Sequence, residues 1–419
     1  MRGPDGLTRA LDRGAVDALL YAGSALFAAY GLRSSTHVDY RTWAAFAWPA
    51  YTAGAVGGAL LLACAARLGR RQIMRTRVAL AAAVLAGALV APLGAEIARR
   101  AQGGSKFVAS EVIITEGAAA EFLAGRDPYA AHFGSAELAG GTPSIAEHFP
   151  YLPGMAVFGL PRALAPRSPW TDGRIYFSLV TALATGAALA LWRAHPSARL
   201  LALQLLVVLP TGAALLVIGG DDVAVLALCL LGLVLAQRGR RGASLAAVAG
   251  AASLKLTAWP VLLALVIADP RVRRGTAGRA RLALAAAFLG LVMLPAAAHP
   301  THFAEDVLAF PAGRTALPSP ATTATVGSLV AGIVGATSPP GHARVLVCTA
   351  MLGLGLLLGA AALLALTRSR GPRTRPAAEA AVGAAAVLVA LILLAPIGRS
   401  GYFVYPLELA VWGGLLSRA

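Results

Sequence analysis

The chain has 419 residues, of which 58% are hydrophobic and only 13% are charged. Soluble proteins contain roughly 45 to 50% apolar and about 25% charged residues, so this chain has too few charges to cover a water-soluble surface. The composition indicates an integral membrane protein and excludes a disordered one. The formal net charge of +17 does not indicate nucleic-acid binding, because the arginines cluster in short loops between apolar runs, where anionic lipid is the expected partner.

The apolar stretches predict an all-α, polytopic transmembrane helix bundle. Eight stretches are long enough to span a bilayer, and they cover residues 15–32, 43–66, 78–96, 175–192, 200–218, 279–298, 344–366 and 377–397. Shorter or interrupted stretches cover residues 145–165, 222–236, 242–268, 322–337 and 402–417. Together they predict about 10 to 13 membrane helices. The segment 1–13 carries charges of both signs, so we expect the first helix to be retained rather than cleaved as a signal peptide. The three cysteines lie in apolar runs, which excludes a disulfide framework.

Arginine-rich loops set the expected sidedness of the bundle. Basic loops stay in the cytoplasm, so we place on the cytoplasmic face residues 67–77, 237–241, 271–281 and 368–375. The outer face then carries residues 33–42, 97–174, 219–222 and 299–321. This arrangement requires the stretch 145–165 to stay at the surface, and its prolines favour that. It also requires the stretch 322–337 to dip into the membrane and return. The informative polar residues therefore gather on the outer face.

The stretch 242–268 lies between two basic loops and contains a lysine, Lys255. It is too short for two full spans, so we expect either a re-entrant pair of half-helices bent near Lys255 or a single span with a buried lysine. An ammonium within an apolar run costs on the order of 2.5 to 3.5 kcal/mol on insertion scales. Lys255 therefore either faces a partner such as a lipid phosphate, pairs with an internal carboxylate, or reaches the membrane interface.

The segment 110–129, SEVIITEGAAAEFLAGRDPY, opens the large outer loop. It predicts an amphipathic surface helix that ends at Gly125, because Pro128 prevents its continuation. An acidic residue, an alanine-rich helix and Leu-x-Gly-x-x-x-Tyr resemble the first outer loop of polyprenyl-phosphate-dependent glycosyltransferases of the GT-C class, particularly glycosyltransferase family 87. Further stretches are similar to motifs of that family, namely HFPYLP at 148–153, GGDDV at 219–223, AASLKLTAWP at 251–260 and RSGYFVYP at 399–406.

The resemblance implies a GT-C-like module over 97–419, with its catalytic outer loop at about 97–174 and amino-terminal transmembrane helices at 1–96 as an addition. It implies transfer of a sugar, mannose or a pentose, from a polyprenyl-phosphate donor to a glycolipid or polysaccharide acceptor outside the cytoplasmic membrane. The donor leaves as a stable phosphate anion, so one carboxylate base and one or two cations suffice. We expect no nucleotide, no cofactor and no obligatory metal.

The resemblance places the catalytic base at Glu111, where the family usually has aspartate. Glu116 is the second candidate, and Asp39, on the loop after the first span, is the third. Alternatively, Glu111 and Glu116 are solvated residues of a first helical turn, which the helix dipole favours, and Asp39 is a plain loop residue.

Further residues are candidates for substrate binding. They are Arg126, Asp127, Tyr129, His132, His148, Tyr151, Asp221, Asp222, Lys255, Arg399, Tyr402 and Tyr405. Simpler roles remain open: the aspartates of the GGDD turn cap a helix, Arg399 and its tyrosines form an interfacial belt, and the histidines are ordinary loop residues.

Two other function classes compete with the transferase. A transporter or flippase of lipid-linked sugars is the first, but many transporters contain repeated halves, and this chain shows no sequence repeat. A non-catalytic relative is the second, and the glutamate at position 111 keeps it open. We therefore expect a membrane glycosyltransferase.

Overall fold

The computed structural model describes residues 14–103, 108–133, 148–272, 274–315, 323–337, 342–368 and 375–418. Within these ranges every regular element is helical, and eight helical segments are long and apolar enough to cross a membrane. Each overlaps one of the eight predicted spans, although the third begins at Arg70, within the predicted basic loop 67–77. The all-α polytopic bundle is therefore confirmed. The predictions for the segment 1–13 and for most of the loop 368–375 lie outside the described residues.

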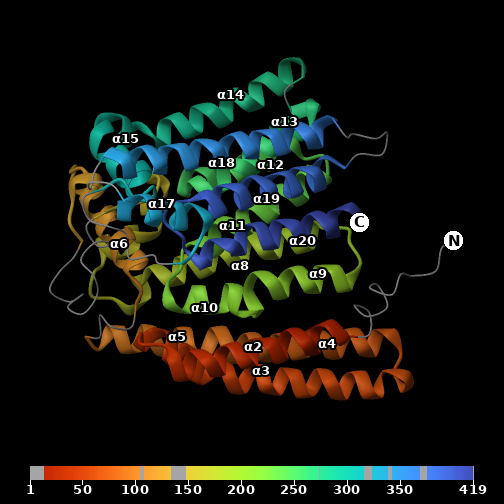
Figure 1. The fold of residues 1–419 in the computed structure, drawn as a ribbon. Helices are drawn as coiled ribbons and strands as arrows, with labels where there is room; N and C mark the ends of the chain where they lie inside the picture. The colour runs from red at the N-terminus through yellow and green to blue at the C-terminus, as the bar shows by residue number, and fades with distance from the viewer. Residues whose placement is uncertain are drawn as a thin grey trace.

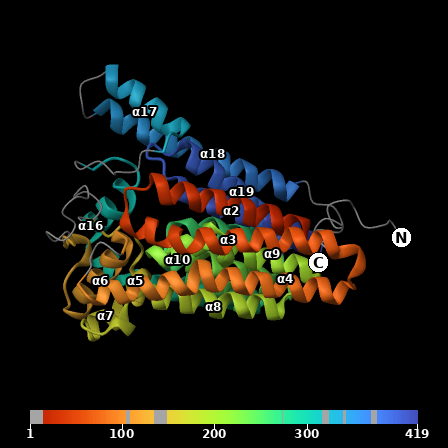
Figure 2. The ribbon, with the colours of Figure 1, turned by 90° about the horizontal axis from the view of Figure 1, so that it is seen from below.

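The helices run side by side along one axis, as Figures 1 and 2 show. Short 3-10 or π-helical turns join several of them, and those that bear on the site are Pro128–Ala130, Pro153–Gly159, Leu256–Ala258 and Ser400–Phe403. In chain order the helices are α2 (Ala15–Ser34), α3 (Val38–Cys64), α4 (Arg70–Leu85), α5 (Ala91–Ala101), α6 (Ser110–Leu123), α7 (Leu160–Leu164), α8 (Gly173–Leu191), α9 (Pro196–Leu203), α10 (Pro210–Ile218), α11 (Asp222–Gln237), α12 (Arg241–Leu254), α13 (Trp259–Ala268), α14 (Gly275–Val292), α15 (Leu294–Ala298), α16 (Pro300–Phe303), α17 (Val326–Thr337), α18 (His342–Arg368), α19 (Pro376–Leu394) and α20 (Val404–Arg418).

The amino-terminal helices α2 to α5 form a layer against the rest of the bundle (Figure 1). Buried polar contacts attach this layer. The Tyr51 hydroxyl donates to the carbonyl of Val208 at 2.7 Å, and the Arg77 guanidinium, which is fully buried, donates both to Asp17 and, at 2.9 Å, to the Ser197 hydroxyl. Buried polar groups are costly unless they are paired, so these contacts fix where the layer sits.

The stretch 242–268 forms a hairpin of two half-helices. α12 ends where Lys255 adopts an extended backbone conformation, and α13 returns after one 3-10 turn. The far ends of the two helices meet, because the Arg241 guanidinium donates to the Asp269 carboxylate at 2.8 Å. The hairpin bent at Lys255 is therefore confirmed, and the alternative of a single span is wrong.

The proline-rich stretch 145–165 does not form a span, as predicted. The helical elements of its described part are the turn Pro153–Gly159 and the five-residue helix α7. Both pack closely over α6. A Cβ on Gly159 would lie 2.3 Å from the carbonyl oxygen of Thr115, so only glycine allows this approach. As a result α6 is a packed helix rather than the expected surface helix. The sequence does not reveal this covering, because it depends on contacts between separate segments.

The same stretch also contacts the hairpin. The Leu152 amide donates to the Leu254 carbonyl at 3.2 Å, and a Cβ on Gly154 would lie 2.6 Å from the carbonyl oxygen of Ser253. These contacts place Tyr151 beside the bend at Lys255.

Helix α17, in the stretch predicted to dip and return, has 12 residues. At 1.5 Å per residue it is too short to cross a bilayer. Its start lies beside the turn after α19, since the Thr325 hydroxyl donates to the Ala395 carbonyl at 2.7 Å. The helix is therefore too short for a full span, as the prediction requires, while its dip into the membrane and return stays a prediction.

Candidate active site

Four segments that are far apart in the sequence meet at one end of the bundle. They are the first turn of α6, the turn before α11, the bend between α12 and α13, and the turn before α20. Together they supply a group of ionisable side chains, which we name the Lys255 cluster: Glu111, Asp221, Asp222, Lys255 and Arg399.

The Lys255 ammonium pairs with two carboxylates. It donates to Asp221 at 2.7 Å and to Asp222 at 2.5 Å, and it lies over the rings of Tyr151 and Tyr402, 5.3 and 5.6 Å from their centroids. The side chain is buried. Of the roles that the sequence left open, the structure therefore shows pairing with internal carboxylates, supported by cation–π contacts.

Glycine geometry places the two aspartates. Gly219 ends α10 with φ +109°, and a Cβ there would lie 2.2 Å from the side chain of Val112, so only glycine fits. The suggestion that these aspartates cap α11 is wrong. Asp221 occupies the cap position, but its side chain makes no capping hydrogen bond. The Asp222 carboxylate instead also accepts from the Tyr405 hydroxyl at 2.7 Å. The second carboxylate oxygen of Asp221 is buried and has no hydrogen-bond partner within the described ranges.

Glu111 and Arg399 form the most exposed pair of the cluster. The Arg399 guanidinium donates to the Glu111 carboxylate at 2.7 Å, and the two side chains are 39% and 14% exposed, respectively. Helix α6 is held in place for this contact, because the Ala109 amide donates to the Ile218 carbonyl at 2.9 Å. Burial alone would raise the pKa of Glu111, but the charge and hydrogen bond of Arg399 outweigh it and hold the pKa below its usual range. Glu111 is therefore ionised at neutral pH.

Glu116 belongs to a different group, which we name the Arg174 cluster: Glu96, Arg100, Glu116, Asp172 and Arg174. Arg100 contacts Glu116 at 2.6 Å and Asp172 at 2.9 Å. Arg174 donates to both oxygens of Asp172, each at 2.9 Å. Burial would raise the pKa of Asp172, but the two arginines lower it to about 2. This geometry separates Glu116, the second candidate base, from Glu111.

Sequence reasoning missed most of the Arg174 cluster. Arg100 ends one apolar span, while Asp172 and Arg174 begin the next. In the sequence, each of these residues is an ionisable residue at the edge of a span, and that pattern usually indicates anchoring at the membrane interface. No sequence spacing indicates that these residues pair with one another.

The remaining candidates lie outside the Lys255 cluster. Asp39 is buried in the first turn of α3 and accepts from the Tyr40 amide. Arg126 pairs with Glu121 on the surface, and His132 is exposed. Tyr129 is buried and its hydroxyl donates to the Tyr151 carbonyl at 3.2 Å, so it supports the site from behind.

His148 is buried beside Asp306, at 2.5 Å from its carboxylate. The same carboxylate accepts from the Phe149 amide at 2.7 Å, so these contacts join the segment at 148–149 to the turn that follows α16. Among the described residues, the histidines and carboxylates close enough to share one metal ion are Asp127, His299 and His302, none of which belongs to the Lys255 cluster.

Comparison with known proteins gives one match. The family model of glycosyltransferase family 87 matches residues 149–396, which is more than half of the chain. The matched region contains Tyr151, Asp221, Asp222 and Lys255, whereas Glu111 and Arg399 lie on either side of it. No curated protein and no solved structure gives a match.

Proposed function

Because the chain belongs to glycosyltransferase family 87 and is a multi-pass membrane glycosyltransferase, we propose that it uses a polyprenyl-phosphate sugar as its donor. The proposed sugar is mannose, and the proposed acceptor is a glycolipid or a polysaccharide. The active face is the outer face of the cytoplasmic membrane. Family membership decides against the transporter that competed at the sequence level.

The observation that carries this proposal is the convergence of the Lys255 cluster. The cluster lies at the end of the bundle opposite the Arg241–Asp269 contact, which belongs to the side expected in the cytoplasm. It combines a partly exposed carboxylate, a partly exposed guanidinium and a lysine flanked by two tyrosine rings. Transfer from a lipid phosphate needs a base for the acceptor hydroxyl and cations for the phosphate, and the cluster provides both.

We assign the roles by exposure. Arg399 is the more exposed cation, so it contacts the donor phosphate first, with two parallel hydrogen bonds available. Lys255 holds Asp221 and Asp222 and adds its positive charge near the phosphate. The Asp221 oxygen that has no partner among the described residues accepts a hydrogen bond from a hydroxyl of the bound sugar, which would satisfy it.

Glu111 is the proposed general base. In the free enzyme Arg399 lowers its pKa, which also weakens it as a base. When the donor phosphate draws Arg399 away, the pKa of Glu111 rises and the carboxylate becomes a stronger base next to the acceptor. Donor binding therefore prepares the base.

We also propose that 97–419 is the transferase module and that 1–96 is an amino-terminal addition. The family match lies entirely within the larger part, which supports this division.

The central test is Glu111→Gln. We expect turnover with polyprenyl-phosphate mannose to fall by about 10²- to 10⁴-fold, the usual contribution of a general base, while donor affinity is retained. Glu121→Gln, on the same helix but paired with the surface residue Arg126, is the matched control and should keep its turnover. Unchanged turnover of Glu111→Gln would reject the assignment.

The pH profile tests the preparation of the base. The acid limb of kcat/KM reports the free enzyme, and the acid limb of kcat reports the complex. Because the pKa of Glu111 is lowered in the free protein, we expect the kcat/KM limb at a lower pH than the kcat limb. Coincident limbs would show that Arg399 does not leave Glu111 on donor binding.

A further inference from the structure

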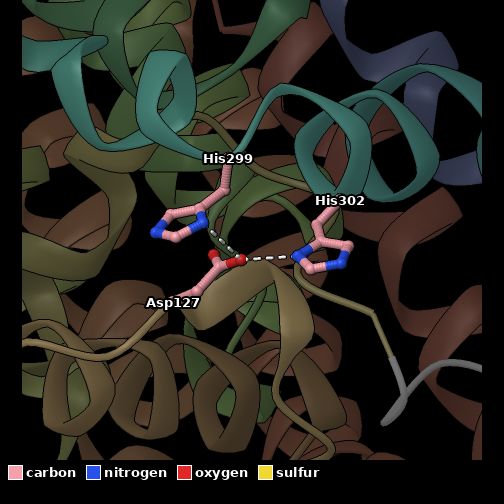
Figure 3. A group of neighbouring side chains, drawn as sticks. All are labelled: Asp127, His299 and His302. Atoms are coloured by element: carbon pink, nitrogen blue, oxygen red, sulfur yellow. Dashed lines mark hydrogen bonds and ion pairs between the residues drawn. The ribbon is translucent and has the colours of Figure 1, made fainter.

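Three potential metal ligands from two outer segments meet away from the Lys255 cluster. Asp127 lies in the turn after α6, while His299 and His302 lie at the junction of α15 and α16 (Figure 3). The Nδ1 atoms of His302 and His299 lie 2.7 and 3.5 Å, respectively, from the same oxygen of Asp127. The ligand atoms all lie within 4.8 Å of one another.

The backbone orients all three side chains toward one point. His299 directly precedes Pro300, the first residue of α16, and His302 lies two residues after it. The two imidazole rings are nearly parallel, with an interplanar angle of 10°. The other oxygen of Asp127 accepts from the Tyr129 amide at 3.0 Å, which leaves the first oxygen facing the histidines. Hydrogen bonds of this kind fix the orientation of metal-binding carboxylates.

From this geometry we propose that Asp127, His299 and His302 bind one Zn²⁺ ion. Two imidazole nitrogens and one carboxylate oxygen are a usual ligand set for zinc, with a fourth position open to water. Zinc lies about 2.0 to 2.2 Å from such atoms in a tetrahedral arrangement, which separates neighbouring ligands by roughly 3.2 to 3.6 Å. The His299 separation of 3.5 Å lies within this range. The His302 separation of 2.7 Å is a hydrogen-bond distance, and it must lengthen by roughly 0.5 Å when the ion binds.

The exposure of the three side chains fits an ion that enters from solvent. The histidine side chains are 47% and 48% exposed, whereas that of Asp127 is only 10% exposed. An ion therefore reaches the imidazoles directly and finds a carboxylate that is already held in place. Calcium and magnesium are poor candidates, because they prefer sites made mainly of oxygen ligands.

The ion cross-links two outer segments behind the active site. Phe303, which follows His302, packs edge-on against Tyr129, with the ring centroids 5.3 Å apart. The Tyr129 hydroxyl in turn donates to the Tyr151 carbonyl, and Tyr151 lies beside Lys255. Zinc at this position stabilises the support of Tyr151 and takes no part in sugar transfer.

The test measures zinc content and thermal stability of the full chain without a polyhistidine tag. The protein is purified in detergent, treated with EDTA, passed through a desalting column and incubated with ZnCl₂. We expect one tightly bound zinc per chain after a second desalting step, and an increase of several degrees in Tm, because an ion that binds the folded state stabilises it.

Variants separate the proposed site from adventitious binding. His302→Ala and Asp127→Asn should lose both the bound zinc and the Tm increase, while His132→Ala, which removes an exposed histidine outside the group, should retain both. Folding of each variant is checked by its Tm in EDTA. Wild-type protein without stoichiometric zinc, or His302→Ala with unchanged zinc content, would overturn the proposal and leave a hydrogen-bonded contact between the two segments. Because no sugar transfer is measured, this outcome is independent of the proposed function.

Discussion

The Lys255 cluster and the Arg174 cluster contain the same kinds of charge in different surroundings. As named, each has three carboxylates and two cations, and Arg162 adds a further cation beside the Arg174 cluster, 3.7 Å from Glu116. Each cluster leaves one buried carboxylate oxygen without a partner in the described part of the chain. In the Arg174 cluster both cations are arginines, and their side chains are 11% and 0% exposed. In the Lys255 cluster the Arg399 side chain is 39% exposed, and tyrosine rings flank the lysine.

The difference in exposure distinguishes the Arg174 cluster, which holds helices together, from the Lys255 cluster, which we propose to bind the donor. A buried arginine that donates to both oxygens of a carboxylate, as Arg174 does to Asp172, is costly to separate from it. The Glu111–Arg399 pair is partly exposed, and ion pairs that reach solvent contribute less to stability than buried ones. We therefore expect Arg399 to leave Glu111 for another anion at a smaller cost than Arg174 would leave Asp172. The kinds of charge are shared, and on the proposed function the exposure of the cations decides which cluster binds the donor.

The largest expected effect comes from breaking the scaffold. Arg174→Met leaves Glu96 without its buried cation and Asp172 with Arg100 alone, so we expect the free energy of unfolding to fall by about 3 to 5 kcal/mol. Denaturation of the purified protein in detergent measures the free energy of unfolding. The protein that remains folded should keep its donor affinity. Arg399→Met is the comparison: it should unfold nearly as the wild type does but bind donor poorly. The distinction between the two clusters is contradicted if Arg399→Met is the less stable variant and Arg174→Met is the variant that binds donor poorly.

A somewhat smaller effect is expected at Lys255. Lys255→Met leaves two buried aspartates unpaired and removes a charge near the donor phosphate, and losses of this kind cost about 2 to 5 kcal/mol. We expect both stability and donor affinity to fall, measured by denaturation and by equilibrium binding of polyprenyl-phosphate mannose.

The double variant Lys255→Met/Asp221→Asn separates the two effects. Removing one carboxylate charge should restore part of the stability without restoring donor affinity. Full recovery of donor affinity would show that Lys255 only neutralises the aspartates.

The smallest effect concerns acid stability. The pKa of Asp172 is lowered from 3.8 to about 2 in the folded protein, so its stabilisation is complete above its ordinary pKa and is lost as the pH falls toward 2. The loss amounts to about 2 kcal/mol. We expect the free energy of unfolding of the wild type to fall more steeply below pH 4 than that of Asp172→Asn, and parallel curves would contradict the assignment.

The sequence predicts the bundle well, because apolar length alone determines a span. It also offers the hairpin at Lys255 as one of two arrangements, since two basic loops on one side require the chain between them to return, but it leaves a single span with a buried lysine open. The covering of α6 by the turn Pro153–Gly159 was not predictable, because it depends on close backbone contacts at Gly154 and Gly159.

The candidate site was only partly predictable. Glu111 and Arg399 were both named on family resemblance, but their direct contact is not readable from either motif. The Arg174 cluster could not be predicted at all, because the pairing of Glu116 with Arg100 rather than with a substrate depends on how α5, α6 and α8 pack.

The contact between Glu111 and Arg399 joins residues 288 positions apart. A ribosome that adds about 5 to 20 residues per second therefore needs roughly 15 to 60 s after making the glutamate before it makes its partner. Nascent chains that end between residues 111 and 399 contain the Glu111 carboxylate but lack the Arg399 guanidinium, which we propose to bind the donor phosphate. On the proposed function, incomplete translation products therefore lack part of the site that binds the lipid-linked sugar.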